Sequence, residues 1–358
     1  MLAADRRINL VDHADHRPVL AIDLGGTQIR AALVTPDRTV HCRRSTDTRD
    51  EEGAESVIAR IVEAATGVLA EASGAGLPPP IGAGISSPGP LDAGRGIVLS
   101  PPNLRRWQDV PLVEALASEL ELPCYLERDT NVAVMAEWRY GAAAGSTDAV
   151  YVTVSTGVGG GIISGGRPLL GSGGLAGEAG HLVVELDGPV CGCGGVGHVE
   201  AIASGTAIER EARDLLARGE APVLAQLAAT GDPVDAELVA RAADGGDAAC
   251  VALLDRAWVA IGALCASLVN LLNPDVIVIG GGIAEHRPRL FEVARRELER
   301  RVLPALADTA RIEPAALGGD VSLIGLLPIV NDRIGDPAYA SGSRTSRGAT
   351  TVEGAVPS

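Results

Sequence analysis

The amino-acid sequence predicts an α/β protein made of two related domains that flank a cleft. Three observations support this prediction. The chain has 358 residues, enough for about two domains of ordinary size. Short apolar runs alternate with longer segments in which apolar residues recur at helical spacing. The order strand, glycine turn, strand opens both halves of the chain, at residues 18–34 and again at residues 149–164.

The charged residues exclude several classes of protein. The formal net charge is −16, and all thirty cationic side chains are arginine. A chain without lysine cannot form a phosphate loop that ends in Gly-Lys-Ser/Thr, and it has no lysine for a Schiff base. The excess of acidic residues argues against a nucleic-acid-binding surface. We therefore expect small-molecule partners and no nucleic acid.

The distribution of apolar residues and the number of cysteines indicate the cellular compartment in which the protein acts. No stretch approaches the ~20 consecutive apolar residues of a membrane span. Residues 1–17 are charged and lack the apolar run of a secretory signal. Six cysteines in a chain of this length are too few for a disulfide scaffold. These features predict a cytoplasmic protein with no membrane partner.

In the first half of the chain, apolar runs and helical periodicity predict the elements in order. Gly25 and Gly26 separate the first two strands, so we expect a hairpin there. Pro78-Pro79-Pro80 interrupts the chain between the first helix and the next strand. The expected strands are 18–24, 29–34, 39–44, 81–86 and 124–127, and the expected helices are 55–72, 112–120 and 131–140.

The second half repeats the opening and then becomes mainly helical. The expected strands are 149–154, 162–164 and 276–279, with a glycine turn at 155–161, and the expected helices are 207–218, 236–243, 248–272 and 288–303. We divide the chain into an N-terminal extension (1–17), a small domain (18–128, completed by about 318–332), a large domain (129–317) and a disordered tail (333–358).

Three glycine turns follow predicted strands, at 23–30, 155–161 and 280–282. Glycine lets backbone N–H groups approach an anion without interference from a Cβ atom. An ordinary hairpin turn would explain the first turn equally well, but the three together predict a nucleoside triphosphate held by both domains. The candidate residues for its phosphates and Mg²⁺ are Asp23, Gly25, Gly26, Thr27, Arg30, Ser155, Thr156, Gly157, Gly159, Gly160, Gly281 and Gly282.

Asp129 stands between an apolar strand and a predicted helix. A carboxylate at a strand end that faces the cleft can deprotonate a substrate hydroxyl. The alternative is a helix N-cap, a common use of aspartate before a helix. The segment alone leaves both interpretations open.

Two cysteines and two histidines lie within eighteen residues: His181, Cys191, Cys193 and His198. Thiolates and imidazoles are the ligands of tetrahedral zinc. Four protein ligands leave no open position, so the predicted zinc is structural and fixes a glycine-rich loop. Glu178 and Glu200 flank the set and would move with it, and carboxylates accept hydrogen bonds from sugar hydroxyls. Solvated surface charge is the other interpretation of these two residues.

Taken together, these motifs resemble the ROK family of sugar kinases and sugar-responsive repressors, which have the actin-like ATPase (ribonuclease H-like) fold. The resemblance covers about residues 18–330. It rests on Asp23-Leu24-Gly25-Gly26-Thr27, Ser87-Pro88-Gly89-Pro90, Pro102-Asn103-Leu104 with Trp107, Asp129 with Asn131 and Glu137, the turn at 155–161, Gly177-Glu178-Ala179-Gly180-His181, and residues 191–200.

The resemblance implies a role for each matching residue. Asp129 matches the catalytic base, and the turns at 23–30, 155–161 and 280–282 match two phosphate motifs and an adenosine motif. His181, Cys191, Cys193 and His198 match the zinc site. The positions implied for the sugar are Gly89, Asn103, Arg128, Asp129, Glu178, His181 and Glu200.

The chain departs from the family pattern at two positions. His198 stands where the family usually has cysteine, and imidazole is also a zinc ligand. Arg128 stands where the family usually has an asparagine that helps to bind the sugar. A guanidinium there can stabilise the Asp129 anion or reach another group of the substrate.

The resemblance implies ATP-dependent phosphorylation of a hexose, with glucose and its 6-hydroxyl as the first choice. N-acetylmannosamine, mannose, fructose and allose are alternative acceptors, and polyphosphate is an alternative donor. A repressor is disfavoured because only 22 residues precede Asp23, too few for a DNA-binding module. A sugar-binding protein without catalysis is the other alternative, because of Arg128. The resemblance also implies a homodimer or homotetramer.

Overall fold

The computed structural model describes residues 17–342. Within them the chain forms two compact units, one of Arg128–Pro328 and one of residues 17–127 together with 329–342. Most of the predicted N-terminal extension and part of the predicted tail lie outside the described residues, at 1–16 and 343–358. Residues 333–342, which we assigned to a disordered tail, instead make backbone hydrogen bonds, for example from the Cys124 N–H to the Ser341 carbonyl oxygen. The packed chain therefore extends past residue 333.

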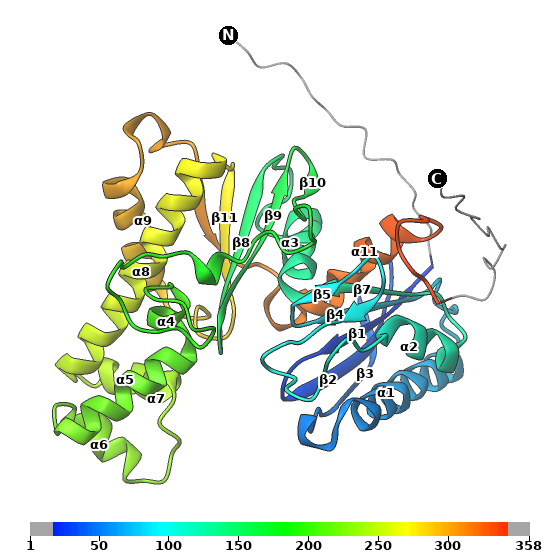
Figure 1. The fold of residues 1–358 in the computed structure, drawn as a ribbon, viewed down its shortest axis with the longest axis horizontal. Helices are drawn as coiled ribbons and strands as arrows, with labels where there is room; N and C mark the ends of the chain where they lie inside the picture. The colour runs from blue at the N-terminus through cyan, green and yellow to red at the C-terminus, as the bar shows by residue number, and fades with distance from the viewer. Residues whose placement is uncertain (1–16, 343–358) are drawn as a thin grey trace, which may run out of the picture. The chain divides into compact units, whose positions relative to one another are not determined.

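The unit of residues 17–127 and 329–342 is built on a five-stranded sheet with the order β3-β2-β1-β4-β7 (Figure 1). β1, β2 and β3 are antiparallel neighbours, and β4 runs parallel to β1. Helices α1 (Ala54–Gly74) and α2 (Leu112–Leu120) contribute Ile61 and Leu116 to the core of this unit. The strands are β1 (Val19–Leu24), β2 (Gln28–Val34), β3 (Val40–Asp47), β4 (Ala83–Ser87) and β7 (Cys124–Arg128).

The unit of Arg128–Pro328 contains a second five-stranded sheet, with the order β10-β9-β8-β11-β12. Helix α3 packs on β8 and β9, and α8 packs against α9 (Figure 1). The strands are β8 (Ala149–Val154), β9 (Val158–Ser164), β10 (Arg167–Pro168), β11 (Val276–Gly280) and β12 (Arg311–Pro314). The helices that cover most of this unit are α3 (Asp129–Tyr140), α5 (Gly205–Arg218), α7 (Ala236–Asp244), α8 (Ala248–Leu272) and α9 (Pro288–Arg301), with the shorter α6 (Pro222–Ala228) between α5 and α7 in the sequence.

The two sheets share a topology: three strands are antiparallel neighbours, and the next strand in the sheet runs parallel to the central one. The central strands β1 and β8 are almost fully buried along their length, as expected for strands covered on both faces. This repeat confirms the predicted α/β fold class.

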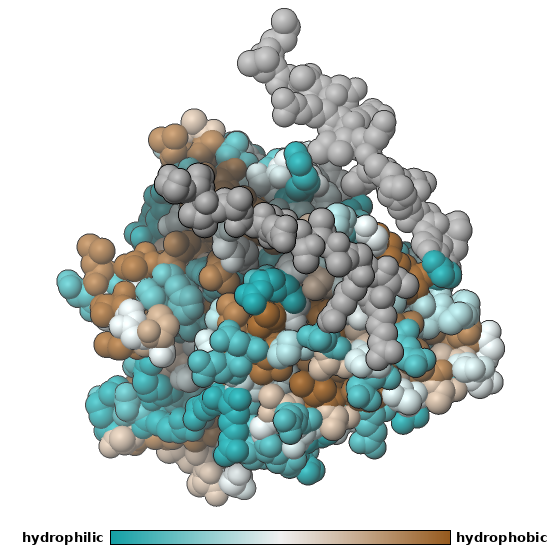
Figure 2. Space-filling model, turned by 45° about the vertical axis from the view of Figure 1, so that its right-hand side comes forward, coloured by the Kyte–Doolittle hydropathy of each residue, from teal (hydrophilic) through white to brown (hydrophobic). Residues whose placement is uncertain are grey.

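Among the helices of residues 17–342, α8 alone has the length and apolar composition of a membrane span. It buries Trp258, Ile261 and Leu264 in the core of its unit, and half of its most apolar window is buried. We therefore interpret α8 as a core helix. Over the face drawn in Figure 2, hydrophobic and hydrophilic side chains are interspersed.

Helices α2 and α8 begin and end at the predicted residues. The glycine turn at 155–161 was predicted too long, because β9 begins at Val158 and Gly159–Gly161 lie within the strand. Several short elements give no periodic signal in the sequence. They are β5 (Leu91–Asp92), β6 (Ile97–Val98), β10, β12, α4 (Glu200–Ala203), α6, α10 (Val321–Ile324), α11 (Leu326–Arg333) and four 3₁₀ turns, η1 (Asp50–Glu52), η2 (Ala179–His181), η3 (Pro304–Leu306) and η4 (Gly318–Asp320).

Glu137 anchors the end of helix α3. Its side chain is fully buried, and its carboxylate accepts hydrogen bonds from the backbone N–H groups of Ala142, Ala316 and Leu317 at 2.7, 2.9 and 3.0 Å. These bonds join α3 to the segment that follows β12. Hydrogen bonds to an ionised acceptor are about twice as strong as neutral ones. Through these hydrogen bonds, Glu137 fixes the end of the helix that begins at Asp129.

We expect Glu137→Gln to lower the free energy of unfolding by about 2 kcal/mol, because an amide leaves one of the three N–H donors without an acceptor. Urea denaturation followed by tryptophan fluorescence measures the change. Glu299→Gln, at an exposed position on α9, is the matched control and should change stability by less than about 0.5 kcal/mol. Equal losses in the two variants would contradict the anchoring role.

Candidate functional site

Asp129 is exposed although the residues of β7 before it are buried. It is the first residue of α3, and Arg128, with extended backbone angles, takes the N-cap position. The Asp129 Oδ1 atom accepts a hydrogen bond from the Thr130 N–H at 2.7 Å. Asp129 is therefore not the N-cap that we considered as an alternative. Its carboxylate reaches solvent at the carboxyl end of a buried strand.

The side chain of Arg128, the residue before Asp129, is only 5% exposed. Its Nη1 atom donates to Glu178 Oε1 at 2.5 Å. Its Nη2 atom donates to the carbonyl oxygens of Ala176 at 2.5 Å and Gly160 at 3.3 Å, and to Asn131 Oδ1 at 3.3 Å. Both terminal nitrogens of the guanidinium thus donate hydrogen bonds to other groups of the protein.

The glycines of β9 allow two segments to lie directly on this strand. A Cβ atom on Gly161 would come within 2.4 Å of the Thr130 carbonyl oxygen at the start of α3. A Cβ atom on Gly160 would come within 2.7 Å of the Ala179 Cβ and 2.9 Å of the Gly177 carbonyl oxygen. Atoms this close clash, so only glycine permits the approach. Gly159 and Gly160, which we predict as phosphate contacts, both lie within β9.

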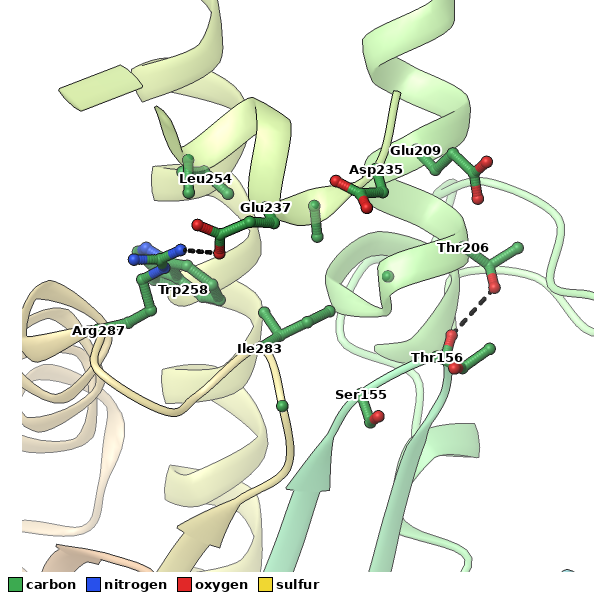
Figure 3. A pocket seen from close by; sticks show the side chains of 14 residues that line it. Ser155, Thr156, Thr206, Glu209, Asp235, Glu237, Leu254, Trp258, Ile283 and Arg287 are labelled. Atoms are coloured by element: carbon green, nitrogen blue, oxygen red, sulfur yellow. Dashed lines mark hydrogen bonds and ion pairs between the residues drawn. The ribbon is translucent and has the colours of Figure 1, made fainter. Parts of the chain in front are cut away.

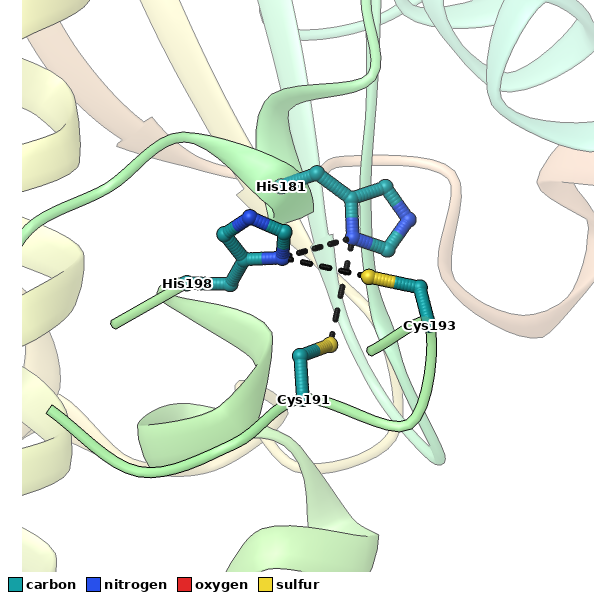
Figure 4. A group of neighbouring side chains, drawn as sticks. All are labelled: His181, Cys191, Cys193 and His198. Carbon is teal, nitrogen blue, oxygen red and sulfur yellow. Dashed lines mark hydrogen bonds between the residues drawn. The ribbon is translucent and has the colours of Figure 1, made fainter. Parts of the chain in front are cut away.

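The four predicted metal ligands converge (Figure 4). Their ligand atoms all lie within 4.8 Å of one another. The Nδ1 atoms of His181 and His198 are 3.3 Å apart, Cys193 Sγ is 3.3 Å from His198 Nδ1, and Cys191 Sγ is 3.9 Å from His181 Nδ1. Tetrahedral zinc, with bonds of about 2.0 Å to nitrogen and 2.3 Å to sulfur, separates its ligand atoms by roughly 3.3–3.8 Å.

The donor set also fits zinc chemically, and it explains how the surrounding loop is held. Several apolar side chains of the loop are not buried: Val183 is 51%, Val190 64% and Leu186 86% exposed. A segment that buries so little needs another source of stability, and a structural metal supplies one. Four protein ligands complete the tetrahedron, so the arrangement is that of a structural site.

Glu200 connects the metal loop to the β8–β9 hairpin. Its Oε2 atom accepts a hydrogen bond from the Val158 N–H at 3.1 Å, and its Oε1 atom lies 3.5 Å from Cys191 Sγ. It is the first residue of α4 and half-buried. Neither Glu200 nor Glu178 is therefore an isolated surface charge, the alternative considered above.

In the other unit, the first glycine turn joins β1 to β2. Asp23 and Arg30 are paired residues of this hairpin, and the Arg30 Nε and Nη2 atoms donate to Asp23 Oδ2 at 3.1 and 2.7 Å. The Thr48 hydroxyl donates to the Gly25 carbonyl oxygen at 2.6 Å, which fixes the turn.

Two of the predicted sugar-binding residues also belong to this unit. Asn103 is exposed, and its Cβ atom faces Gly26. Gly89 is half-buried and precedes Pro90 in a cis peptide bond. The structure thus places Asn103 beside the first glycine turn.

The second and third glycine turns lie together. The Ile283 N–H donates to the Val154 carbonyl oxygen at 3.1 Å. Gly281, in the third turn, has a φ of +95°, and a Cβ atom on it would come within 2.5 Å of the same carbonyl oxygen. The Gly205 N–H donates to the Ser155 carbonyl oxygen at 2.8 Å. The Thr206 hydroxyl donates to the Thr156 carbonyl oxygen at 3.0 Å. The start of α5 therefore holds the second turn.

Beside these two turns lies a pocket of about 300 Å³ (Figure 3). Leu254, Trp258 and Ile283 form apolar parts of its wall. An ion pair between Arg287 and Glu237, with a distance of 2.5 Å, lies at the edge of the pocket. The remaining lining residues are Ser155, Thr156, Gly205, Thr206, Glu209, Asp235, Ala236, Ala240 and Gly282.

Some residues of the site were missed from the sequence. Thr48 and Thr206 hold two of the glycine turns, and the Ala176 carbonyl holds Arg128. No sequence signal marks a single threonine far from the turn that it supports. Helical periodicity does indicate the pocket side chains of α7 and α8, but only as core positions.

The chain matches the family model described as ROK family over residues 19–333. It is 35% identical over 317 residues to the glucokinase of Thermotoga maritima, covering 88% of this chain and 98% of that protein. It is 39% identical over 225 residues to the N-acetylmannosamine kinase of Escherichia coli O157:H7, covering 63% of this chain and 74% of that protein. A crystal structure of a ROK family glucokinase from Streptomyces griseus in complex with glucose and AMPPNP superimposes with a TM-score of 0.75 at 30% identity, covering 87% of this chain and 98% of that one.

Removing a ligand from the metal centre should release zinc and destabilise the loop. We expect Cys193→Ser to lose stoichiometric zinc after dialysis and to show a lower Tm. Zinc is measured by mass spectrometry and Tm by differential scanning calorimetry. Cys42→Ser, at a cysteine of the other unit, is the control and should retain zinc. Full zinc retention in Cys193→Ser would contradict the proposed ligand set.

Zinc retention should also depend on pH. Burial raises the pKa of the Cys191 thiol to about 11 in the metal-free protein. A metal must displace this proton, so the apparent affinity for zinc should fall by about tenfold for each pH unit of acidification through this thiol alone. Competition with a chelator of known affinity between pH 6 and 8 measures the slope.

Proposed function

Because the chain belongs to the ROK family of sugar kinases, we propose that it transfers the γ-phosphoryl group of ATP to the 6-hydroxyl of glucose. The observation that carries the proposal is the exposed carboxylate of Asp129, which follows a buried strand and lies next to the residue that binds Glu178. The similarity to a glucokinase extends over nearly the whole length of that protein, whereas the similarity to an N-acetylmannosamine kinase is partial. This difference favours glucose over N-acetylmannosamine.

Asp129 is the proposed general base. It accepts the proton of the sugar hydroxyl as that oxygen attacks the phosphorus. One of its oxygens accepts the Thr130 N–H, which fixes the rotamer of the carboxylate. General base catalysis of this kind contributes about 10²–10⁴-fold to the rate, and the rest comes from positioning and charge neutralisation.

Three residues near the metal centre are the proposed contacts for sugar hydroxyls. Glu178 and Glu200 accept hydrogen bonds through carboxylate oxygens. The His181 Nδ1 atom faces the metal ligands, and its other ring nitrogen points away from them (Figure 4). A metal bound at Nδ1 fixes the tautomer with hydrogen on Nε2, so His181 donates to a sugar oxygen. Gly89 and Asn103 of the other unit remain predicted sugar positions from the family resemblance.

The proposed phosphoryl donor is ATP. The apolar wall of the pocket beside the second and third turns suits a nucleobase, whereas Glu209 and Asp235 would repel a chain of phosphates. The backbone N–H groups of the glycine turns and the hydroxyls of Ser155 and Thr156 are the proposed hydrogen-bond donors to the phosphates. Asp23 is the proposed contact for Mg²⁺ through water, and Mg²⁺ bound with ATP neutralises phosphate charge. We propose that the enzyme acts in the cytoplasm, as a homodimer or homotetramer.

Asp129→Asn should lower kcat with glucose and ATP at least about 100-fold, because an amide cannot accept the proton. Glucose binding, measured by calorimetry, should stay detectable. A coupled assay for ADP release measures turnover across glucose, mannose, fructose, allose and N-acetylmannosamine. Asp214→Asn, at an exposed position on α5, is the control for loss of one negative charge. Turnover of Asp129→Asn within a few fold of the wild type would refute the assignment.

Gly282→Leu tests the donor pocket. A Cβ atom on Gly282 meets nothing within 4 Å, and Gly282 lines the pocket, so the longer side chain should occupy its space without disrupting the fold. We expect KM for ATP to rise at least about tenfold, with little change in KM for glucose. Gly74→Leu, at an open position at the end of α1, is the control. An unchanged KM for ATP, or efficient use of polyphosphate, would place the donor elsewhere.

A further inference from the structure

Arg128 makes contacts that no asparagine could make in its place. Its guanidinium reaches Glu178, two backbone carbonyls and the amide of Asn131. These partners come from α3, from β9 and from the segment before η2. The side chain of Arg128 is 5% exposed, whereas that of Glu178 is 47% exposed. The arginine therefore does not itself face solvent, but it fixes a carboxylate that does.

A short path leads from this ion pair to the metal centre. Glu178 is the N-cap of η2, and the His181 N–H donates to the Glu178 carbonyl oxygen at 3.1 Å. His181 is one of the four converging ligands. At the other end, Arg128 immediately precedes Asp129. The ion pair thus joins the loop that carries the metal ligands to the start of the helix that carries the proposed base.

The geometry requires arginine in particular. The planar guanidinium donates in two directions at once, to a carboxylate from Nη1 and to carbonyl oxygens from Nη2. Lysine would keep the charge but has one nitrogen, so it cannot span both sets of acceptors. Because the pair is largely shielded on the arginine side, water screens its attraction less than that of a fully exposed pair.

We propose that Arg128 is a positioning residue that couples metal binding to sugar binding, an inference that rests on the proposed function. It holds Glu178 where a sugar hydroxyl is bound, and the metal holds the same segment from the other end through His181. Binding at either place should then strengthen binding at the other, because such coupling is reciprocal.

The first test compares Arg128→Asn and Arg128→Lys with Arg256→Asn. Arg256 on α8 forms an exposed ion pair with Glu185 of the same metal loop, at 3.0 Å, so it controls for loss of one arginine that contacts the loop. We expect Arg128→Asn to raise KM for glucose about 10–100-fold, as loss of a supporting contact does, with kcat changed by less than about threefold. Arg128→Lys should recover part of the loss, and Arg256→Asn should resemble the wild type.

The second test is a double-mutant cycle with Glu178→Gln. If Arg128 acts through Glu178, Arg128→Asn should change KM for glucose less than about threefold in the Glu178→Gln background. Thermal denaturation of each variant separates this effect from misfolding. Additive effects on KM would show that Arg128 acts by another route and would overturn the proposal.

The third test does not need turnover. Zinc release to a chelating indicator should be at least about tenfold faster in Arg128→Asn than in the wild type, and unchanged in Arg256→Asn. Saturating glucose should slow release from the wild type but not from Arg128→Asn. Equal release rates, or equal protection by glucose, would overturn the coupling. If the wild type binds and phosphorylates no hexose, the proposed function fails, whereas the release rates without sugar still test the link between Arg128 and the metal loop.

Discussion

The arrangement of the candidate site depends on the close approach of two segments to strand β9. The start of α3 lies against Gly161, and the segment that contains Gly177 lies against Gly160, at distances that leave no room for a side chain. Arg128 is hydrogen-bonded to both segments, through Asn131 Oδ1 in α3 and through the Ala176 carbonyl oxygen. The positions of Asp129 and Glu178 follow from this packing, since each directly adjoins one of the packed residues.

The candidate metal site stabilises another segment of the same unit, the loop of residues 181–198. The loop of residues 181–198 exposes large apolar side chains, so hydrophobic burial contributes little to its stability. Convergence of two thiols and two imidazoles supplies the missing constraint. Because His181 is one turn from Glu178, and Cys191 lies beside Glu200, the constraint extends to the two carboxylates that we propose for sugar binding.

Sequence periodicity was enough to predict the helices of nine or more residues in the described part of the chain, because a long helix such as α8 repeats its apolar pattern many times. The repeated hairpin and the metal ligands were also visible, since their signals are local. The glycine run at 155–161 was misread because glycine serves two purposes there: Ser155–Gly157 form a turn, and Gly159–Gly161 permit close packing in β9. The role of Arg128 was left open for a similar reason. Its main partner, Glu178, is fifty residues away in the sequence, and local patterns cannot predict such a pairing.

The charges around the proposed base explain why a buried cation is useful at this position. Asp129, Glu178 and Glu200 are all acidic, and phosphoryl transfer brings further negative charge to the acceptor. Like charges repel one another, and an opposite charge nearby offsets that repulsion. The chain has no lysine, and its 46 acidic residues outnumber its thirty arginines. Arg128 offsets the charge of Glu178 from the buried side and leaves the exposed side of that carboxylate for a hydroxyl. A neutral asparagine would offer a hydrogen bond there but no compensating charge. The replacement therefore changes how the site holds its carboxylates, while the exposed acid at position 129 is retained.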